Sequence, residues 1–461
     1  MAKDAHGDRD HSPPDLPLAS GAKVLGFGHS FIQRAGWGIL VNEIPRDMNA
    51  SNARGVLPWI RLWDQRFNLD VFIDPNNNLG KNNFVSGAFQ GVGGDHIVRD
   101  GHAPGTLPRT PYVIARAPDI VYLDIGTNDI SGGVNAAELI ALLDQQISML
   151  IRSGIWVVVQ TITDRKSWPE GHPKQLVVTA VNDWLLSQDG RTGLRICDLT
   201  KSGFNYPAFD FTLFGGDVIH PNPKGARAIA LTLLPILQEM VKPFDAVNPD
   251  QHSSGNMWPN FGLRGTEGSK TPGAVIGEVA TDHRIIRVAG DSIAHCSKEM
   301  SEQGHEKQVI TFIPSGTKSE NRVEQWRFCT SNSLDLSASG IVPGKDWLEA
   351  LLFVEASSWI GWLSLELQIA VDGTQPYVAR GGLINPDAKT QNLPLGDDGF
   401  SGWFRICRFQ IPEQINPKAL RIDTRPFSIQ FDRQATGSGT LKISQPVLRK
   451  ASDPRSAWNI A

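Results

Sequence analysis

Two patterns of apolar residues divide the chain. Between residues 23 and 241, short apolar runs alternate with segments whose apolar residues recur every three to four positions. This alternation is typical of a parallel sheet covered by helices on both faces. The runs predict strands at 23–28, 69–73, 119–124, 155–160 and 194–197. The helical spacing predicts helices at 33–44, 135–153 and 174–187, and a last one that starts after Asn222-Pro223 and is kinked at Pro235.

Beyond residue 275 the apolar period changes to two. In 362–371, Leu363, Leu365 and Leu367 alternate with polar residues, which is the pattern of a half-buried strand. Further strands are expected at 284–288, 308–313, 347–355, 403–411, 427–431 and 441–443. Turn-rich spacers between short strands favour an antiparallel sandwich, and we expect a jelly roll.

Changes in composition predict five segments. Residues 1–21 are polar and rich in proline, and we expect a disordered leader. Residues 22–243 form the α/β domain, 244–275 a linker, 276–450 an accessory β-sandwich, and 451–461 a tail.

Bulk properties exclude several classes of protein. The formal net charge of the 461 residues is -4, which gives no basic surface for nucleic acid. No apolar run has the length of a secretory signal core or a membrane-spanning helix, so we expect no membrane insertion. As written the protein is expected to be soluble and cytoplasmic, with secretion or association with a virion left open. The four cysteines show no metal-site spacing and no disulfide framework, although one bridge in the C-terminal part stays open.

Four blocks of polar residues follow predicted strands or precede the last helix. They are Gly28-His29-Ser30, Gly93-Gly94-Asp95, Gly126-Thr127-Asn128-Asp129 and Asp217-Val218-Ile219-His220. The carboxyl ends of parallel strands meet at one edge of a sheet, where ligands bind in open α/β folds. Serine hydrolysis needs a nucleophile, a histidine base, an acid that orients it and donors for the oxyanion. The four blocks supply all of these groups.

These blocks resemble the motifs of the SGNH (GDSL-type) hydrolase superfamily over residues 22–241. The resemblance implies a flavodoxin-like three-layer fold and an esterase or lipase activity without a cofactor or metal. It implies that Ser30, Asp217 and His220 are catalytic. The oxyanion would be bound by the backbone of Ser30 and Gly94 and the side chain of Asn128. The family usually has Asp where this chain has His29, which leaves the activation of the serine and its pH profile open.

Other residues have weaker claims to a role. We expect His29, His96 and Trp168 to contact substrate. Gly290-Asp291-Ser292 is a literal Gly-Asp-Ser, but nothing downstream supplies the partner motifs, and we interpret it as a β-turn. Tryptophans of the C-terminal part could stack on sugars, while core packing is favoured for any single one of Trp359, Trp362 and Trp403.

We therefore expect a serine esterase that removes acetyl or other short acyl groups from a glycan. The C-terminal half resembles a carbohydrate-binding jelly-roll module, and the glycan rests on that association alone. The partner would be a small-molecule or glycan ester, and the oligomeric state is not predicted. One alternative is a general short-chain esterase, thioesterase or lysophospholipase. The other is a non-catalytic glycan-binding or virion surface protein with a decayed site.

Overall fold

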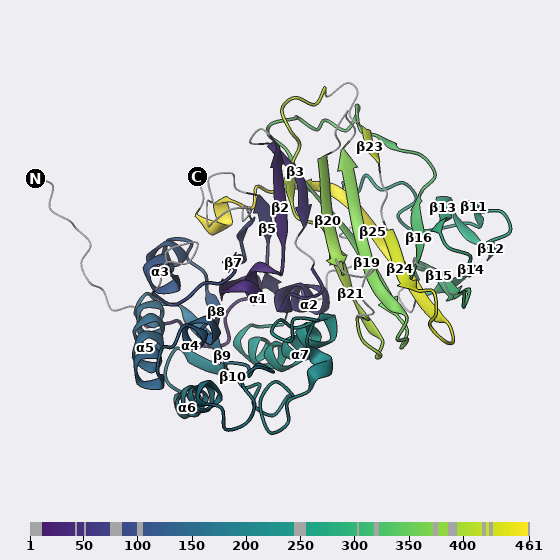
Figure 1. Cartoon of the computed structure of the whole chain (residues 1–461). Helices are drawn as coiled ribbons and strands as arrows, with labels where there is room; N and C mark the ends of the chain where they lie inside the picture. The colour runs from purple at the N-terminus through teal and green to yellow at the C-terminus, as the bar shows by residue number, and fades with distance from the viewer. Residues whose placement is uncertain are drawn as a thin grey trace, which may run out of the picture.

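The protein is described from a computed structural model of the whole chain. The structure describes residues 12–41, 44–49, 52–73, 85–98, 105–243, 255–301, 304–317, 322–371, 377–385, 394–416, 421–423 and 427–459. An α/β region lies beside a larger β region, and the two share one interface (Figure 1).

A parallel sheet forms the centre of the α/β region. Its strand order matches the flavodoxin-like order 2-1-3-4-5 when the strands are numbered along the chain. The sheet runs β10 (Leu194–Cys197), β9 (Trp156–Gln160), β8 (Ile120–Asp124), β1 (Ala22–Gly28) and β4 (Phe67–Asn68), with β7 (Phe89–Gly91) also paired to β1. Four of the predicted strands are thus confirmed. The predicted strand at 69–73 is displaced, because β4 takes the place beside β1 and β5 (Val71–Ile73) pairs instead with β6 (Val85–Gly87).

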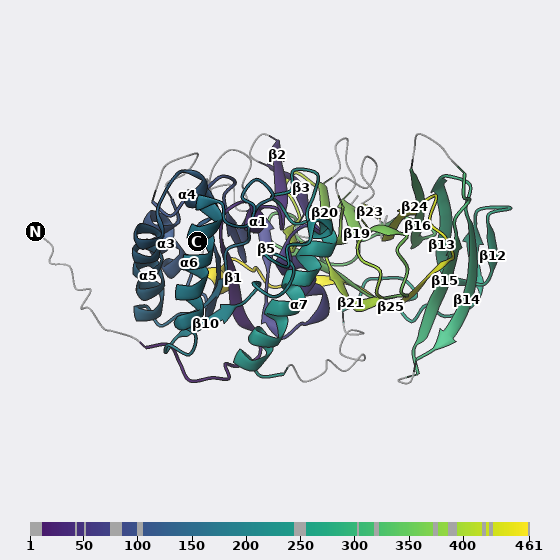
Figure 2. The same cartoon turned by 60° about the horizontal axis from the view of Figure 1, so that its bottom comes forward.

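Helices cover this sheet in the way that the apolar periodicity predicted. α3, α5 and α6 pack together on one side, and α2 and α7 pack together on the other (Figures 1 and 2). The kink expected at Pro235 does not divide α7, which continues through it. The helices are α1 (Ser30–Gln33), α2 (Val56–Trp63), α3 (Thr106–Ala115), α4 (Thr127–Ser131), α5 (Ala136–Arg152), α6 (Pro173–Ser187) and α7 (Pro223–Met240), with a short 3-10 turn, η1 (Phe211–Leu213).

The β region consists of two facing sheets, mostly antiparallel. Phe312 of one sheet contacts Trp326, Trp362 and Phe431 of the other, so their inner faces share an aromatic core. The smaller sheet runs β12 (Val275–Gly277), β14 (Ile293–Met300), β15 (Glu306–Ile313), β25 (Gly439–Ala451), β18 (Trp347–Ala356) and β21 (Phe400–Arg405), with β22 (Phe409–Gln410) on β18. The larger contains β11 (Glu267–Lys270), β13 (Val279–Ala289), β16 (Val323–Thr330), β24 (Phe427–Asp432), β19 (Trp362–Val371) and β20 (Tyr377–Leu383), with β17 (Leu334–Asp335) and β23 (Arg421–Asp423) at its side.

The larger sheet continues into the N-terminal half of the chain. β2 (Trp37–Val41) and β3 (Ile44–Asn49) form an antiparallel pair, and β3 pairs in parallel with β20. In Figure 1 these two strands, coloured as N-terminal, stand next to the green β20. The helix predicted at 33–44 is therefore wrong: α1 ends at Gln33, and the following residues complete a sheet of the other region. The β region is not an appended module, because the α/β region supplies two of its strands.

The predicted leader, linker and tail are also built into the fold where the structure describes them. Leu18 is buried and pairs with Val241 at the end of α7; residues 1–11 lie outside the described residues. In the predicted linker, Trp258 is buried and its indole N–H donates to His283, while residues 244–254 lie outside the described residues. The tail forms η4 (Ser456–Trp458), and Trp458 is fully buried.

Candidate active site

The serine of the first block stands at the carboxyl end of β1, where the strand turns into α1. His29 is the N-cap residue of α1, and its Nδ1 accepts the Phe31 N–H at 3.3 Å. Gly28 has φ +156°, and a Cβ there would lie 1.9 Å from the Asp124 carbonyl oxygen of β8. Glycine is thus required at this position, because β8 approaches the backbone too closely for any side chain.

Ser30 lies within hydrogen-bonding reach of a histidine from the far end of the domain. Its Oγ is 2.8 Å from His220 Nε2, and His220 Nδ1 is 2.6 Å from Asp217 Oδ2. Asp217 Oδ1 accepts the backbone N–H groups of Ile219 and His220 at 3.1 and 3.0 Å. The chain thus brings a hydroxyl, an imidazole and a carboxylate into the serial arrangement that nucleophile activation requires.

The turn that holds this histidine is strained. Val218, between Asp217 and His220, has φ +52°, a left-handed conformation that a β-branched residue rarely adopts. Such strain costs about 1–3 kcal/mol and persists only where the surroundings impose it. Here the Val218 N–H donates to the Gly215 carbonyl, and the Gly215 N–H donates to the His220 carbonyl at 2.8 Å. The strained turn keeps the side chains of Asp217 and His220 within hydrogen-bonding distance of each other.

Electrostatics keep this histidine neutral and its partner ionised. Burial would raise the pKa of Asp217, but the N–H groups of His220 and Ile219 and the His220 ring outweigh it and lower that pKa to about 2. Burial and the charge of Arg34 lower the pKa of His220, against the opposing effect of Asp217. Arg34 itself lies 3.7 Å from Asp217. At neutral pH, His220 is therefore a free base next to a carboxylate.

The glycine-rich second block lies directly beside the nucleophile turn. β7 pairs with the end of β1, and the Val92 N–H donates to the Gly28 carbonyl at 3.0 Å. Gly94 follows in an exposed turn with φ +75° and no atom within 4 Å of a Cβ placed there. Asp95 is anchored below by an ion pair with Arg109. The Asp95–Arg109 ion pair thus holds this turn in place, and Gly94 faces open space.

Asn128 joins the second block to the third. Its Nδ2 donates to the Asp95 carbonyl at 2.9 Å, which leaves its second N–H available, and its Oδ1 accepts from Arg165 at 3.2 Å. These two bonds define which way the amide points. Asp129 is buried and accepts the Ile97 N–H at 3.0 Å, so it anchors the 95–98 loop.

Arg165 is a site residue that the sequence analysis missed. It is buried, its Nε donates to the Thr127 hydroxyl at 2.9 Å, and its guanidinium also reaches the Thr127 carbonyl and Asn128. Burial lowers the pKa of Arg165 to about 10. Its position just after β9, at the carboxyl edge of the sheet, was the signal that could have identified it.

His29 and Asp124 form a buried pair beneath the serine. Because His29 Nδ1 accepts a hydrogen bond, its proton lies on Nε2, which is 3.4 Å from Asp124 Oδ1. Asp124 also accepts from Gln160 at 3.1 Å, and Gln160 accepts from Tyr122. Burial lowers the pKa of His29 to about 3, helped by the charge of Arg165, and burial raises the pKa of Asp124 to about 7. At neutral pH His29 is therefore uncharged, and the Asp124 carboxyl titrates close to that pH.

The tentative substrate contacts lie deeper than expected. His29 is 1% exposed and supports the nucleophile turn from below, and Trp168 is 5% exposed and packs under the Arg165 guanidinium. Both placements favour a positioning role, and contact of these residues with substrate stays a prediction. His96 is half-buried between the second and third blocks, and its Nδ1 is buried without a hydrogen-bond partner among the described residues.

The residues of the β region that the sequence analysis considered for catalysis or sugar binding have structural roles. Ser292 is 1% exposed, and its Oγ donates to Glu324 at 3.0 Å. Trp359 and Trp362 are buried against each other, so they cannot offer a face to sugar; Trp403 packs on Phe353. All four cysteines are buried and none is in a disulfide, so the bridge left open by the sequence is not formed.

Two kinds of feature are absent from the described residues. None of the helices in the described part of the chain is both long and apolar enough to span a bilayer. Within the same residues, no three side chains of His, Cys, Asp or Glu gather in a way that would hold a metal ion.

The flavodoxin-like sheet and the serine, histidine and aspartate at its carboxyl edge define a class: a three-layer α/β domain with the layout of an SGNH hydrolase. Residues 27–228 match the model of the GDSL-like lipase/acylhydrolase family. This part of the chain is therefore similar to that family, as the sequence motifs indicated. No curated protein matches the chain.

Several solved structures resemble the α/β region. A member of the lipolytic protein G-D-S-L family from Veillonella parvula DSM 2008 is 20% identical, with 47% of this chain and 98% of that chain covered and a TM-score of 0.33. A lipase/acylhydrolase from Enterococcus faecalis is 20% identical, with 49% and 100% covered and a TM-score of 0.34. A carbohydrate esterase family 3 protein from Talaromyces cellulolyticus is 22% identical, with 47% and 96% covered and a TM-score of 0.31.

Proposed function

We propose that the protein is a serine ester hydrolase in which Ser30, His220 and Asp217 act as the catalytic triad. The observation that carries this proposal is the continuous chain of contacts from Ser30 Oγ to His220 and from His220 to Asp217, at 2.8 and 2.6 Å. The tautomer is consistent with it, since Asp217 accepts the Nδ1 proton and leaves Nε2 free to accept the serine proton.

In the first half of the reaction, His220 Nε2 takes the proton of Ser30 as Oγ bonds to the ester carbonyl carbon. The carbonyl oxygen becomes an oxyanion, for which the backbone N–H groups of Ser30 and Gly94 and the free N–H of Asn128 are the proposed donors. When the intermediate collapses, the bond to the alcohol breaks, and His220 returns the proton to the leaving oxygen. An acyl group then remains on Ser30.

In the second half, His220 deprotonates a water molecule that attacks the acyl carbonyl. The acid leaves, and Ser30 recovers its proton. Both halves need neutral His220. Because burial and Arg34 lower its pKa, the rate should rise with pH through a value below the usual 6.5 and stay level through neutral pH.

For the substrate, we propose a short acyl group, such as acetyl, carried by a glycan. Polar and charged side chains surround the nucleophile: Arg34 beside Asp217, and Asn128 held by Arg165. Desolvating such groups against a long alkyl chain is unfavourable, whereas sugar hydroxyls can hydrogen-bond to them. A general short-chain esterase, thioesterase or lysophospholipase is the alternative within the same chemistry.

An ester-hydrolysis assay tests the proposal. Wild type and Ser30→Ala would be compared on p-nitrophenyl acetate and octanoate, and then on acetylated xylan with acetate release as the readout. We expect the acetate ester to be cleaved only by wild type, and acetylated xylan to be deacetylated. Equal rates for the two proteins would refute the triad and favour a non-catalytic binding protein, and a preference for the octanoate would refute the glycan substrate.

A further inference from the structure

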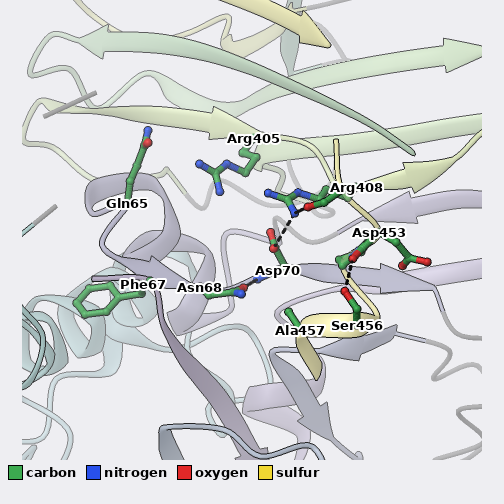
Figure 3. A pocket seen from close by; sticks show the side chains of 12 residues that line it. Gln65, Phe67, Asn68, Asp70, Arg405, Arg408, Asp453, Ser456 and Ala457 are labelled. Atoms are coloured by element: carbon green, nitrogen blue, oxygen red, sulfur yellow. Dashed lines mark hydrogen bonds and ion pairs between the residues drawn. The ribbon is translucent and has the colours of Figure 1, made fainter. Parts of the chain in front are cut away.

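A second pocket lies at the opposite end of β1 from Ser30. It has a volume of about 320 Å³ and is bordered by Gly21, which precedes β1, by Phe67 and Asn68 of β4, and by residues of the β region (Figure 3). β1 has seven residues, or about 20 Å at roughly 3.3 Å each, so the pocket is well separated from the nucleophile. Its volume is near the lower limit of small-molecule sites, roughly 300–1,000 Å³.

Three separate parts of the chain build this pocket. The segment after α2 contributes Gln65, and β4 also lines the pocket from the α/β region. β21 and the turn after it contribute Arg405 and Arg408, and the C-terminal segment contributes Ser452, Asp453 and Ser456. The C-terminal segment is tied to the α/β region by Lys23 Nζ, which donates to the Ala457 carbonyl at 3.1 Å. The pocket exists only because both regions and the C-terminal segment pack together.

The acidic residues in and around the pocket already have cationic partners. Asp453 is paired with Arg455 at 2.7 Å. Arg408 lies 3.4 Å from Asp70 and 3.3 Å from Glu349, and Glu349 is shared with Arg449 at 2.7 Å. The carboxylates are thus fully engaged by the arginines around them.

The charges of Arg405, Arg408 and Arg449 all lower the pKa of Glu349, so three arginines surround this one carboxylate. Among the described residues, no hydrogen bond or ion pair engages the Arg405 guanidinium; the charge of Glu349 is felt there, but Glu349 is already bound by Arg408 and Arg449. Arg61, which is buried behind the pocket, donates to the carbonyls of Arg405 and Ile406 at 2.7 and 2.8 Å and brings a further positive charge.

Buried N–H donors without acceptors also favour an anion in this region. Gln65 Nε2 is buried without a hydrogen-bond partner in the part of the chain that the structure describes, and so is Arg61 Nε. Figure 3 shows the Arg405 guanidinium turned toward the space between the Gln65 amide and Arg408. A negatively charged oxygen in this space would give the buried Gln65 N–H an acceptor.

We propose that this pocket binds one acidic sugar unit, a hexuronate, with its carboxylate on Arg405 and Gln65. The other end of the pocket suits the hydroxyls of the sugar, because Asn68 and Ser452 supply polar groups there. A bidentate arginine–carboxylate contact would supply both charge and orientation. The site would hold an acidic glycan about 20 Å from the nucleophile and is independent of the proposed triad.

Calorimetric titration of the full chain with galacturonate and with galactose tests the proposal. The two sugars differ only at C6, where one has a carboxylate and the other a hydroxymethyl group. We expect galacturonate to bind at least about tenfold more tightly than galactose, and Arg405→Gln to lose at least about tenfold of that affinity. Arg152→Gln, which removes an exposed charge from α5, is the matched control and should bind like wild type.

A second variant protects the test against misfolding. Gln65→Met keeps the volume of the side chain and removes the donor, and we expect it to weaken galacturonate binding severalfold at an unchanged melting temperature. Ser30→Ala should bind galacturonate as wild type does, so a failure of the proposed catalysis leaves this test intact. Equal affinity for the two sugars, an unaffected Arg405→Gln protein, or inorganic phosphate bound as tightly as galacturonate would overturn the assignment.

Discussion

Two Gly-x-Ser turns follow apolar strands in this chain, and they serve opposite purposes. Gly28-His29-Ser30 ends β1, and its serine reaches His220 at 2.8 Å. Gly290-Asp291-Ser292 lies between β13 and β14, and its serine is enclosed: Oγ donates to Glu324 at 3.0 Å and accepts the Trp326 indole N–H at 2.8 Å. The turn that spells the family motif literally is the one without a histidine.

The difference shows what a short motif leaves out. Both turns present a serine, but only the first is at the carboxyl edge of a parallel sheet, where loops from β7, β8 and the segment before α7 converge. Ser292 instead joins a network in which Glu324 also accepts from Ser315 at 2.8 Å and pairs with Arg433 at 3.2 Å. The reactivity of a serine therefore depends on which strands end beside it.

Removing each hydroxyl gives the largest expected effect. Ser30→Ala should lower kcat for p-nitrophenyl acetate by about 10⁴-fold or more, because the nucleophile is lost. Ser292→Ala should keep kcat within about twofold and lower the free energy of unfolding by about 1–3 kcal/mol, because Glu324 and Trp326 lose a buried partner. The checks are steady-state kinetics and urea unfolding. An inactive but fully stable Ser292→Ala protein would show instead that Ser292 is needed for catalysis and not for stability.

The oxyanion donor comes next in size. Asn128→Ala should lower kcat by about 10²–10³-fold with little change in KM, because the second N–H of its amide is expected to bond to the developing oxyanion and not to the ground-state ester. Asn135→Ala is the matched control: it removes the N-cap of α5, whose Oδ1 accepts the Glu138 N–H at 3.0 Å, and should cost about 1 kcal/mol of stability without affecting kcat. A parallel rise in KM would mean that Asn128 binds the ground state instead.

The smallest expected effect concerns the residue between glycine and serine in the first turn. His29→Asp restores the residue that the family usually has, but it would bring a second buried carboxylate next to Asp124, so we expect it to be destabilising. Asp124→Asn in the same protein should recover stability, with a coupling of about 1–3 kcal/mol in urea unfolding at pH 7. Simple additivity of the two changes would show that the two side chains do not interact.

The same pair predicts a pH effect with a definite sign. The pKa of His29 is lowered to about 3, so its contribution to stability is complete above about 6.5 and is lost as the pH falls below that value. The pKa of Asp124 is raised to about 7, so its contribution has the opposite sign and increases as the pH falls from about 7 toward 4. Asp124→Asn should therefore lose stability more steeply in acid than wild type.

The elements that the sequence predicted correctly are those whose positions depend on neighbouring residues. β8, β9 and β10 are short apolar runs, and α5 and α6 have regular apolar spacing with Asn135 and His172 as caps, so their positions follow from neighbouring residues. The contacts within the site also followed, because each polar block directly succeeds a strand or precedes a helix. Whether those residues perform the proposed catalysis stays a prediction.

What the sequence could not show depends on contacts between distant residues. β3 pairs with β20, more than three hundred residues later, and nothing within 37–49 indicates that partner. Arg165 supports Asn128 from another strand, and Trp458 is buried although it lies three residues from the C-terminus. In each case the surroundings are supplied by chain that is remote in sequence, which periodicity and motifs do not report.

The pairing of β3 with β20 also has a temporal consequence. During synthesis, residues 44–49 leave the ribosome long before residues 378–380, which are their partners. Until then the β2–β3 hairpin presents an open edge, which is the kind of surface on which nascent chains associate. The exposed edge of β3 is therefore covered only after most of the polypeptide, up to β20, has been synthesised.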